Sequence, residues 1–128
     1  MNGPIQELAG LHVSVDDVIY MPSLDAPDDR PFPFVYFITI RNNAPMAVTI
    51  RFRKWVVRQQ NGETIVVEGD GVVGQFPNLA PGQSFSYDSY HVIKSESTAT
   101  GSFFGSTDDG RPICVRIPPF EMQPPLFA

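Results

Sequence analysis

The chain has 128 residues, a formal net charge of −5 and 42% hydrophobic residues. It is long enough for one domain, spanning residues 1–128, with a sizeable apolar core, and it is too hydrophobic for a disordered chain. Its acidity argues against nucleic acid as a partner, because phosphate backbones are bound through Lys and Arg. One cysteine, Cys114, excludes an internal disulfide, and we expect it to be a packed strand thiol.

The opening ten residues contain no basic, apolar leader, and no apolar stretch reaches the 18 residues of a membrane helix. We therefore expect a cytoplasmic protein without membrane contact.

Short apolar runs bounded by proline, glycine or asparagine dominate the chain, as is typical of an all-β domain. Asn61-Gly62 predicts a hairpin with a type I′ turn, and Asp108-Asp109-Gly110 predicts a second hairpin turn. A two-layer β-sandwich is the simplest arrangement in which each sheet buries one face against the other, so we predict this fold. The seven predicted strands cover residues 11–19, 34–41, 48–58, 64–72, 84–91, 99–106 and 113–117.

The third predicted strand does not alternate regularly. Ile50 and Phe52 fall on one face and Trp55 and Val57 on the other, so a one-residue bulge near Arg53-Lys54 would place all four on the core side. Trp55 would then anchor the core, and the alternative is a ligand-stacking aromatic. The other predicted core residues are Val13, Val15, Phe85, Tyr87, Ile113, Val115 and Ile117.

The segment Gly69-Asp70-Gly71-Val72-Val73-Gly74 matches the Gly-x-Gly-x-x-Gly pattern of phosphate-binding loops. Such a loop needs a helix directly after it, whose N-terminal amides bind the phosphate. Residues 75–82 contain two prolines and no helical periodicity, so no helix is expected. We therefore interpret Gly69, Gly71 and Gly74 as strand and turn residues, and they remain candidates for a phosphate-contacting loop.

Acidic residues cluster around the end of the first predicted strand. Asp16 and Asp17 lie in the strand, and Asp25, Asp28 and Asp29 follow in a proline-rich loop. They are candidate ligands for Mg²⁺ or Co²⁺, but the loop lacks the Asp-x-Asp-x-Asp-Gly spacing of a dedicated site, and a solvated acidic loop is the alternative.

Motifs of catalysis and of cofactor binding are absent from the sequence: there is no Gly-x-Ser-x-Gly, no His-Glu-x-x-His, no paired cysteines and no P-loop lysine. His12 and His91 are the only histidines, and we expect surface or hydrogen-bonded roles for them rather than zinc binding. We predict no catalytic residue, no cofactor and no metal.

Several motifs together resemble the ApaG family over most of the chain. The glycine string and Pro81-Gly82 match closely, and Arg53-Lys54-Trp55 resembles the family's basic-x-Trp. Gly101-Ser102-Phe103 resembles its Gly-Ser-Tyr, and Ile117-Pro118-Pro119-Phe120 its closing Ile-Pro-Pro-Phe. The departures lie between residues 88 and 99: Tyr90-His91 replaces Gly-Cys, and Ser97 and Ala99 replace Gly and Met.

The resemblance implies an immunoglobulin-like or fibronectin type III-like β-sandwich. Bacterial ApaG proteins are linked by their descriptions to cobalt resistance and magnesium efflux, and eukaryotic proteins carry the domain as an appended partner-recognition module. The resemblance supplies no catalytic residue.

Our leading hypothesis is a non-enzymatic interaction module that recognises a protein partner. Its basis is a set of aromatic and aliphatic residues beyond the predicted core, which a partner or a second copy in a homodimer would cover. The apolar, proline-rich tail from about residue 118, or the first predicted strand, is expected to pack across a sheet edge, either within the monomer or onto a second copy. The aromatic and aliphatic residues beyond the predicted core, which we call the surplus residues, are Phe32, Phe34, Tyr36, Phe104, Leu126 and Phe127.

The alternative hypothesis is that the protein binds a small ligand, namely a divalent metal, phosphate or a nucleotide.

Overall fold

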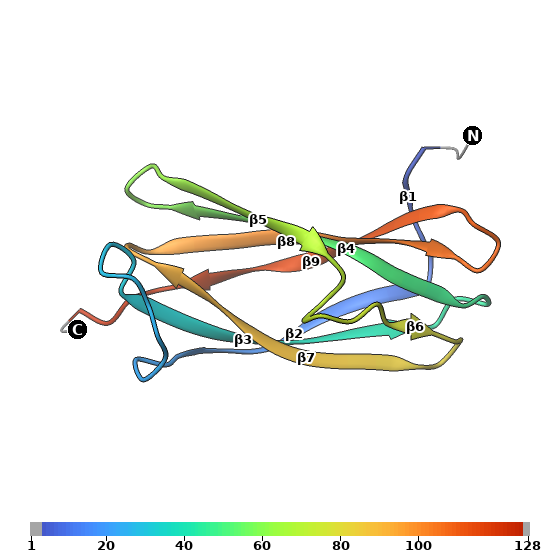
Figure 1. Ribbon diagram of the computed structural model, residues 1–128, viewed down its shortest axis with the longest axis horizontal. Coiled ribbons are helices and arrows are strands. Elements are labelled where there is room, and N and C mark those ends of the chain that lie inside the picture. The colour runs from blue at the N-terminus through green and yellow to red at the C-terminus, as the bar shows by residue number, and fades with distance from the viewer. Residues whose placement is uncertain (1–3, 127–128) are drawn as a thin grey trace.

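The computed structural model describes residues 4–126 and shows two packed β-sheets (Figure 1). The larger sheet has the strand order β1-β9-β8-β4-β5, with β6 paired to β4, and the smaller has the order β2-β3-β7. All pairings are antiparallel except that of β1 with β9. The strands are β1 (Gln6–Glu7), β2 (Leu11–Tyr20), β3 (Phe32–Asn42), β4 (Val48–Gln59), β5 (Thr64–Asp70), β6 (Asn78–Leu79), β7 (Ser84–Ile93), β8 (Ser97–Thr107) and β9 (Pro112–Met122).

The predicted all-β sandwich is confirmed, and each of the seven predicted runs coincides with a strand. The two-residue strands β1 and β6 were not predicted, because so short a segment carries no periodicity. None of residues 4 to 126 lies in a helix that could cross a membrane.

Strand β9 continues beyond its predicted end at residue 117 to Met122, which is fully buried. The register between β8 and β9 shifts where Gly101 pairs with Ile117 and Ala99 pairs with Phe120, so Pro118 and Pro119 sit in the irregularity. A proline lacks the N–H that a regular ladder needs, and the irregularity accommodates both. The first part of the predicted tail therefore belongs to the larger sheet.

Both predicted hairpin turns are present, but the first has a different geometry. Gly62 has φ of 93° and is the positive-φ residue of its turn, whereas a type I′ turn needs positive φ at Asn61 as well. The Gly62 amide donates to the Gln59 carbonyl (3.0 Å), and the Gln59 amide donates to the Glu63 carbonyl (2.9 Å). This is the pattern of a type I turn followed by a glycine bulge.

The irregularity in β4 lies two residues before the predicted place. Its register against β8 shifts between Ile50 and Phe52, so Arg51 is the extra residue rather than Arg53-Lys54. The shift turns Phe52 to the outer face, where its ring lies 6.1 Å from that of Phe104. Arg53 instead pairs with fully buried Phe103 and faces the smaller sheet.

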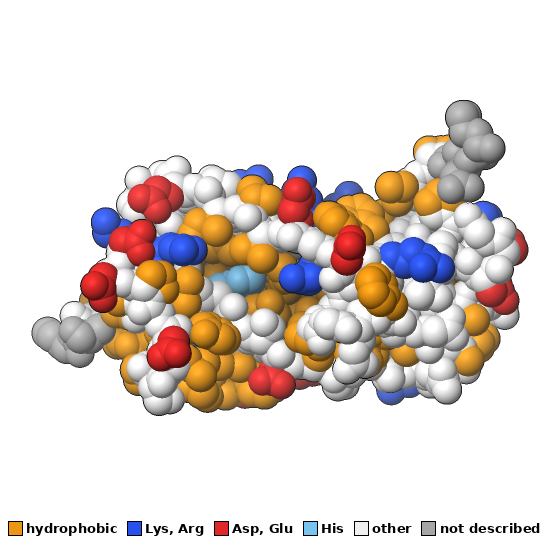
Figure 2. Space-filling view, in the orientation of Figure 1, with side chains coloured by type: hydrophobic (Ala, Val, Ile, Leu, Met, Phe, Trp, Pro, Cys, Tyr) orange, Lys and Arg blue, Asp and Glu red, His pale blue; other side chains and the backbone are white. Residues whose placement is uncertain are grey.

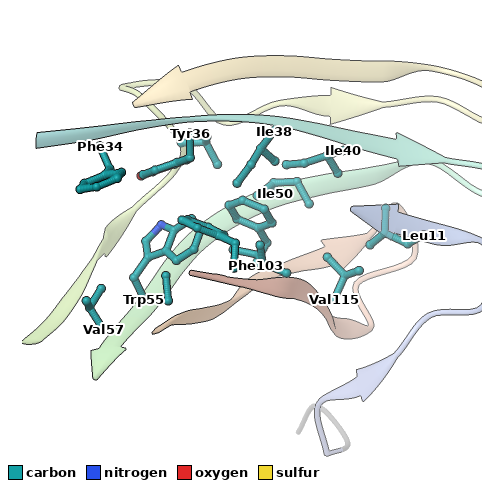
Figure 3. Packing of buried hydrophobic residues seen from close by; sticks show 14 of the residues in the cluster. Leu11, Phe34, Tyr36, Ile38, Ile40, Ile50, Trp55, Val57, Phe103 and Val115 are labelled. Carbon is teal, nitrogen blue, oxygen red and sulfur yellow. The ribbon is translucent and has the colours of Figure 1, made fainter. Parts of the chain in front are cut away.

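Trp55 is the central side chain of the core and is 1% exposed. Its ring points from β4 towards Tyr36 on β3, with ring centroids 4.8 Å apart (Figure 3). The opposite position on β8 is Gly101, where a Cβ would lie 2.7 Å from the Lys54 carbonyl oxygen and 3.1 Å from the Trp55 ring. Only glycine therefore leaves room for the indole.

The prediction that the surplus residues are available to a partner is wrong for two of them. Phe34 and Tyr36 are buried in the core rather than available to a partner, because β3 is the central strand of the smaller sheet and one of its faces packs against the larger. Phe32 is partly buried, Leu126 is 93% exposed, and Phe127 lies outside the described residues. The predicted core residues Val13, Val15, Phe85 and Tyr87 pack at the margin of the core.

Candidate functional site

The glycine string forms the end of β5 and a tight turn after it. Gly69 lies in β5, and the Gly71 amide donates to the Arg51 carbonyl (2.7 Å). Val72 and Gln75 exchange two backbone hydrogen bonds of 2.8 and 2.9 Å. Between them Val73 and Gly74 have φ of 44° and 77°, as in a type I′ turn. The amides of Gly71, Val72 and Gln75 are therefore bonded to backbone, and the short strand β6 follows instead of a helix.

The carbonyl groups of the string hold the side chain of Arg53. Its Nη1 atom donates to the carbonyl oxygens of Asp70 (2.9 Å) and Gly71 (3.2 Å). A Cβ at Gly69 would lie 3.2 Å from Nη1, so the missing side chain makes room for the guanidinium. The string thus fixes a positive charge at the edge of the larger sheet.

A cavity of about 160 Å³ lies between the two sheets beside this guanidinium, and we call it the inter-sheet cavity. Figure 2 shows a histidine in a hollow between the sheets, with Lys or Arg side chains on either side of it. Residues from both sheets and from the loop before β3 contribute to its wall. The lining residues are Arg30, Tyr36, Arg53, Trp55, Val57, Ile65, Val67, Ser89, Tyr90, His91 and Val92.

His91 and Trp55 form the aromatic part of this wall. The His91 ring centroid lies 4.7 Å from that of Tyr36 and 4.8 Å from that of Trp55. His91 is 6% exposed, and burial lowers its pKa to about 4, so the imidazole is neutral at pH 7. Neither His91 Nε2 nor Trp55 Nε1 has a hydrogen-bond partner among the described protein groups.

The acidic candidates are separated in the fold. Asp16 accepts hydrogen bonds from the hydroxyls of Thr39 (2.6 Å) and Ser14 (2.8 Å), which lower the pKa of its carboxyl. Asp17 accepts one from the Val18 amide (2.9 Å). Asp25, Asp28 and Asp29 lie in the loop between β2 and β3. Within residues 4–126 no three acidic, histidine or cysteine side chains converge on a point that could hold a metal ion.

The outer face of the larger sheet carries a shallow groove of about 490 Å³. Val56, Phe104 and Pro118 give it an apolar floor, and Lys54 and Arg116 supply positive charge. Val66 lies next to Val56 on the same face, and its side chain is 53% exposed. This face therefore presents apolar side chains to solvent between positively charged ones.

Cys114 and His12 do not line the inter-sheet cavity. Cys114 is partly buried on β9, and burial raises the pKa of its thiol above the ordinary value, so it is protonated at neutral pH. His12 is exposed on β2 and His91 faces the core from β7, so the two histidines lie on opposite faces of the smaller sheet.

Sequence reasoning missed the role of Arg30 and Arg53 at the cavity. The signal that pointed to this region was the departure Tyr90-His91 from the family pattern, since both residues line the cavity.

Comparison with known proteins places the chain in a family. The family model for the ApaG domain matches residues 22–106. A Protein ApaG from Enterobacter sp. is 38% identical over 110 residues, covering 85% of this chain and 88% of that protein. A Protein ApaG from Pseudomonas putida is 36% identical over 107 residues, covering 83% and 85%. A crystal structure of a Bordetella pertussis protein, 30% identical, superposes with a TM-score of 0.81 over 96% of this chain and 99% of that one. The chain belongs to the ApaG domain family.

Proposed function

We propose that this protein is a non-enzymatic interaction module that recognises a protein partner on the outer face of its larger sheet. The observation that carries the proposal is the apolar groove on that face, bordered by Lys54 and Arg116. Burying apolar side chains such as Phe104 and Val66 favours association by about 25 cal/mol for each Å² removed from water. Exposed apolar surface of this kind is common at protein interaction sites.

The charges around the groove define the partner's chemistry. Lys54 and Arg116 favour a segment that places an apolar side chain in the groove and carboxylates beside it. Arg116 forms an ion pair with Glu7 (3.3 Å), but both side chains are largely exposed. Because an exposed pair contributes little free energy, a partner carboxylate can replace Glu7.

The chemistry of the polar side chains supports a role without catalysis. Cys114 lies on β9, and buried His91 lies between the sheets, so His91 cannot activate that thiol. His12 lines the same surface hollow as Cys114, but burial raises the pKa of the thiol, so it stays protonated and is a weak nucleophile at neutral pH. A cytoplasmic setting is part of the proposal and rests on the single unpaired cysteine.

Photo-crosslinking in the native organism tests the proposal. A photoreactive residue at Ser102, which lines the groove, should give one discrete crosslinked protein, and the same residue at Ser86 on the smaller sheet should not. Phe104→Asp and Lys54→Glu should each abolish the crosslink while Tm stays close to that of the unmodified protein. Equal crosslinking from both positions, or persistence in both variants, would contradict the proposal.

The mass of the crosslinked species also distinguishes another protein from the homodimer that the sequence left open. A product at twice the chain mass of 14.2 kDa would assign the groove to a second copy of this chain. A different mass would assign it to another protein.

A further inference from the structure

We propose that the inter-sheet cavity binds a small oxyanion, of which inorganic phosphate is the simplest member. The site is separate from the groove of the proposed partner, because the cavity lies between the sheets and the groove lies on the outer face of one of them. Three features carry the proposal: the charge of the cavity wall, its buried nitrogen atoms and its size.

The wall of the cavity carries positive charge only. Arg30 and Arg53 line it, and its eleven lining residues include no Asp or Glu. The ion pairs found in residues 4–126 involve Arg111 and Arg116, on other parts of the surface. The two cavity arginines therefore have no carboxylate at ion-pair distance in this part of the chain, and an anion would compensate their charge.

Two residues that line the cavity each have a buried nitrogen atom without a hydrogen-bond partner among the described protein groups. Trp55 is 1% exposed, and its Nε1–H can only donate a hydrogen bond. His91 is 6% exposed, and its neutral ring donates from one nitrogen and accepts at the other. Buried polar atoms are nearly always hydrogen-bonded, so two orphans on one cavity mark a place for a hydrogen-bonding ligand. Oxyanion oxygens are the acceptors that Trp55 lacks.

The Arg53 side chain is fixed in place by backbone carbonyls before any anion binds. With Nη1 fixed by the carbonyls of Asp70 and Gly71, its Nε and Nη2 atoms remain for an oxyanion. A planar guanidinium donates two parallel hydrogen bonds to phosphate or carboxylate oxygens, and fixing it beforehand lowers the entropy lost on binding. The glycine string thus contributes to anion binding indirectly: its carbonyl groups position Arg53, and its amides do not contact the anion.

The volume of the cavity limits the ligand. At about 160 Å³ it is smaller than the 300–1,000 Å³ typical of sites for drug-sized molecules. A free ion or the phosphate group of a monoester fits this volume, and a whole nucleotide does not. The buried aromatic rings of Tyr36 and Trp55 make part of the wall apolar, and an apolar wall strengthens the attraction between the arginines and an anion.

Fluorescence of the single tryptophan reports directly on this cavity, because Trp55 lines it. Titration with inorganic phosphate at ionic strength held constant with sodium chloride should give a saturable change. Arg30→Gln and His91→Phe should each weaken binding by about tenfold or more, because each loses a hydrogen bond to a charged ligand. Arg58→Gln is the matched control, since Arg58 is an exposed cation on the same strand as Arg53 and should leave the affinity unchanged.

A second titration with phenyl phosphate distinguishes the source of the oxyanion. Tighter binding of phenyl phosphate than of phosphate assigns the site to a monoester, and equal or weaker binding assigns it to the free ion. The absence of saturable binding of either compound at millimolar concentration would overturn the proposal. Equal weakening by Arg58→Gln and Arg30→Gln would also overturn it, because the effect would then be one of general charge. Arg30 lies in a loop, so its variant keeps the test valid if His91→Phe alters the fold.

Discussion

Replacing His91 with Phe should remove a large part of the acid sensitivity of the fold. Burial lowers the pKa of His91 from 6.5 to about 4 in the folded protein. Between these pH values the unfolded chain binds a proton that the folded chain does not. The stability contributed by the neutral ring is therefore complete above pH 6.5 and is lost as the pH falls towards 4.

The size of the effect follows from the two pKa values. Each pH unit between them corresponds to 1.36 kcal/mol, so protonation of His91 in the unfolded chain costs the fold about 3 kcal/mol by pH 4. That is a large share of the 5–15 kcal/mol typical of a domain. Phe keeps the aromatic contacts with Tyr36 and Trp55 and cannot be protonated.

Urea unfolding of both proteins at pH 7.5 and at pH 4 measures this difference. The carboxyl groups titrate in both proteins and cancel in the comparison. We expect the unmodified protein to lose about 3 kcal/mol more than His91→Phe between the two pH values. A parallel loss in the two proteins would refute the reasoning, since it would mean that His91 is protonated as readily in the folded chain as in the unfolded one.

Three further predictions concern stability. Trp55→Ala should cost about 3 to 5 kcal/mol in urea unfolding, because the indole is 1% exposed, and an unchanged midpoint would place the ring at the surface. Val73→Asn should stabilise the fold by about 1 kcal/mol, because a β-branched residue is strained at φ of 44°; a lower Tm would contradict this. Deletion of residues 124–128 should leave Tm unchanged, because Leu126 is 93% exposed, and a clear fall in Tm would show that the end of the chain packs on the domain.

Turn signals and alternation were enough to predict the architecture. Most predicted strands are bounded by Pro, Gly or Asn, which favour turns for local steric reasons. The exceptions are the link between β7 and β8, which contains none of the three, and Pro118 and Pro119, which lie within β9. The position of the bulge in β4 was not predictable, because alternation shows that a register change occurs but many positions satisfy it. Its true place depends on β8, where Gly105 sits opposite Ile50 and fits only without a side chain.

The cavity could not be predicted from the sequence because it is made by residues that are far apart along the chain. Arg30, Arg53 and His91 come from a loop and from strands of both sheets, and their convergence depends on the bulge that turns Arg53 inward. The glycine string was correctly expected in a strand and a turn, yet its contact with Arg53 is made by backbone carbonyls. Backbone carbonyls carry no signature in a sequence.

The indole N–H signal of Trp55 in a two-dimensional proton–nitrogen NMR spectrum tests the oxyanion site most directly. The chain has one tryptophan, so this signal is unambiguous, and its Nε1 atom lacks an acceptor in the described structure. Titration with phosphate should shift the signal downfield in a saturable manner, with the same dissociation constant as the fluorescence titration, and the shift should be greatly reduced in Arg30→Gln. A signal that stays in place while phosphate is added would contradict the account.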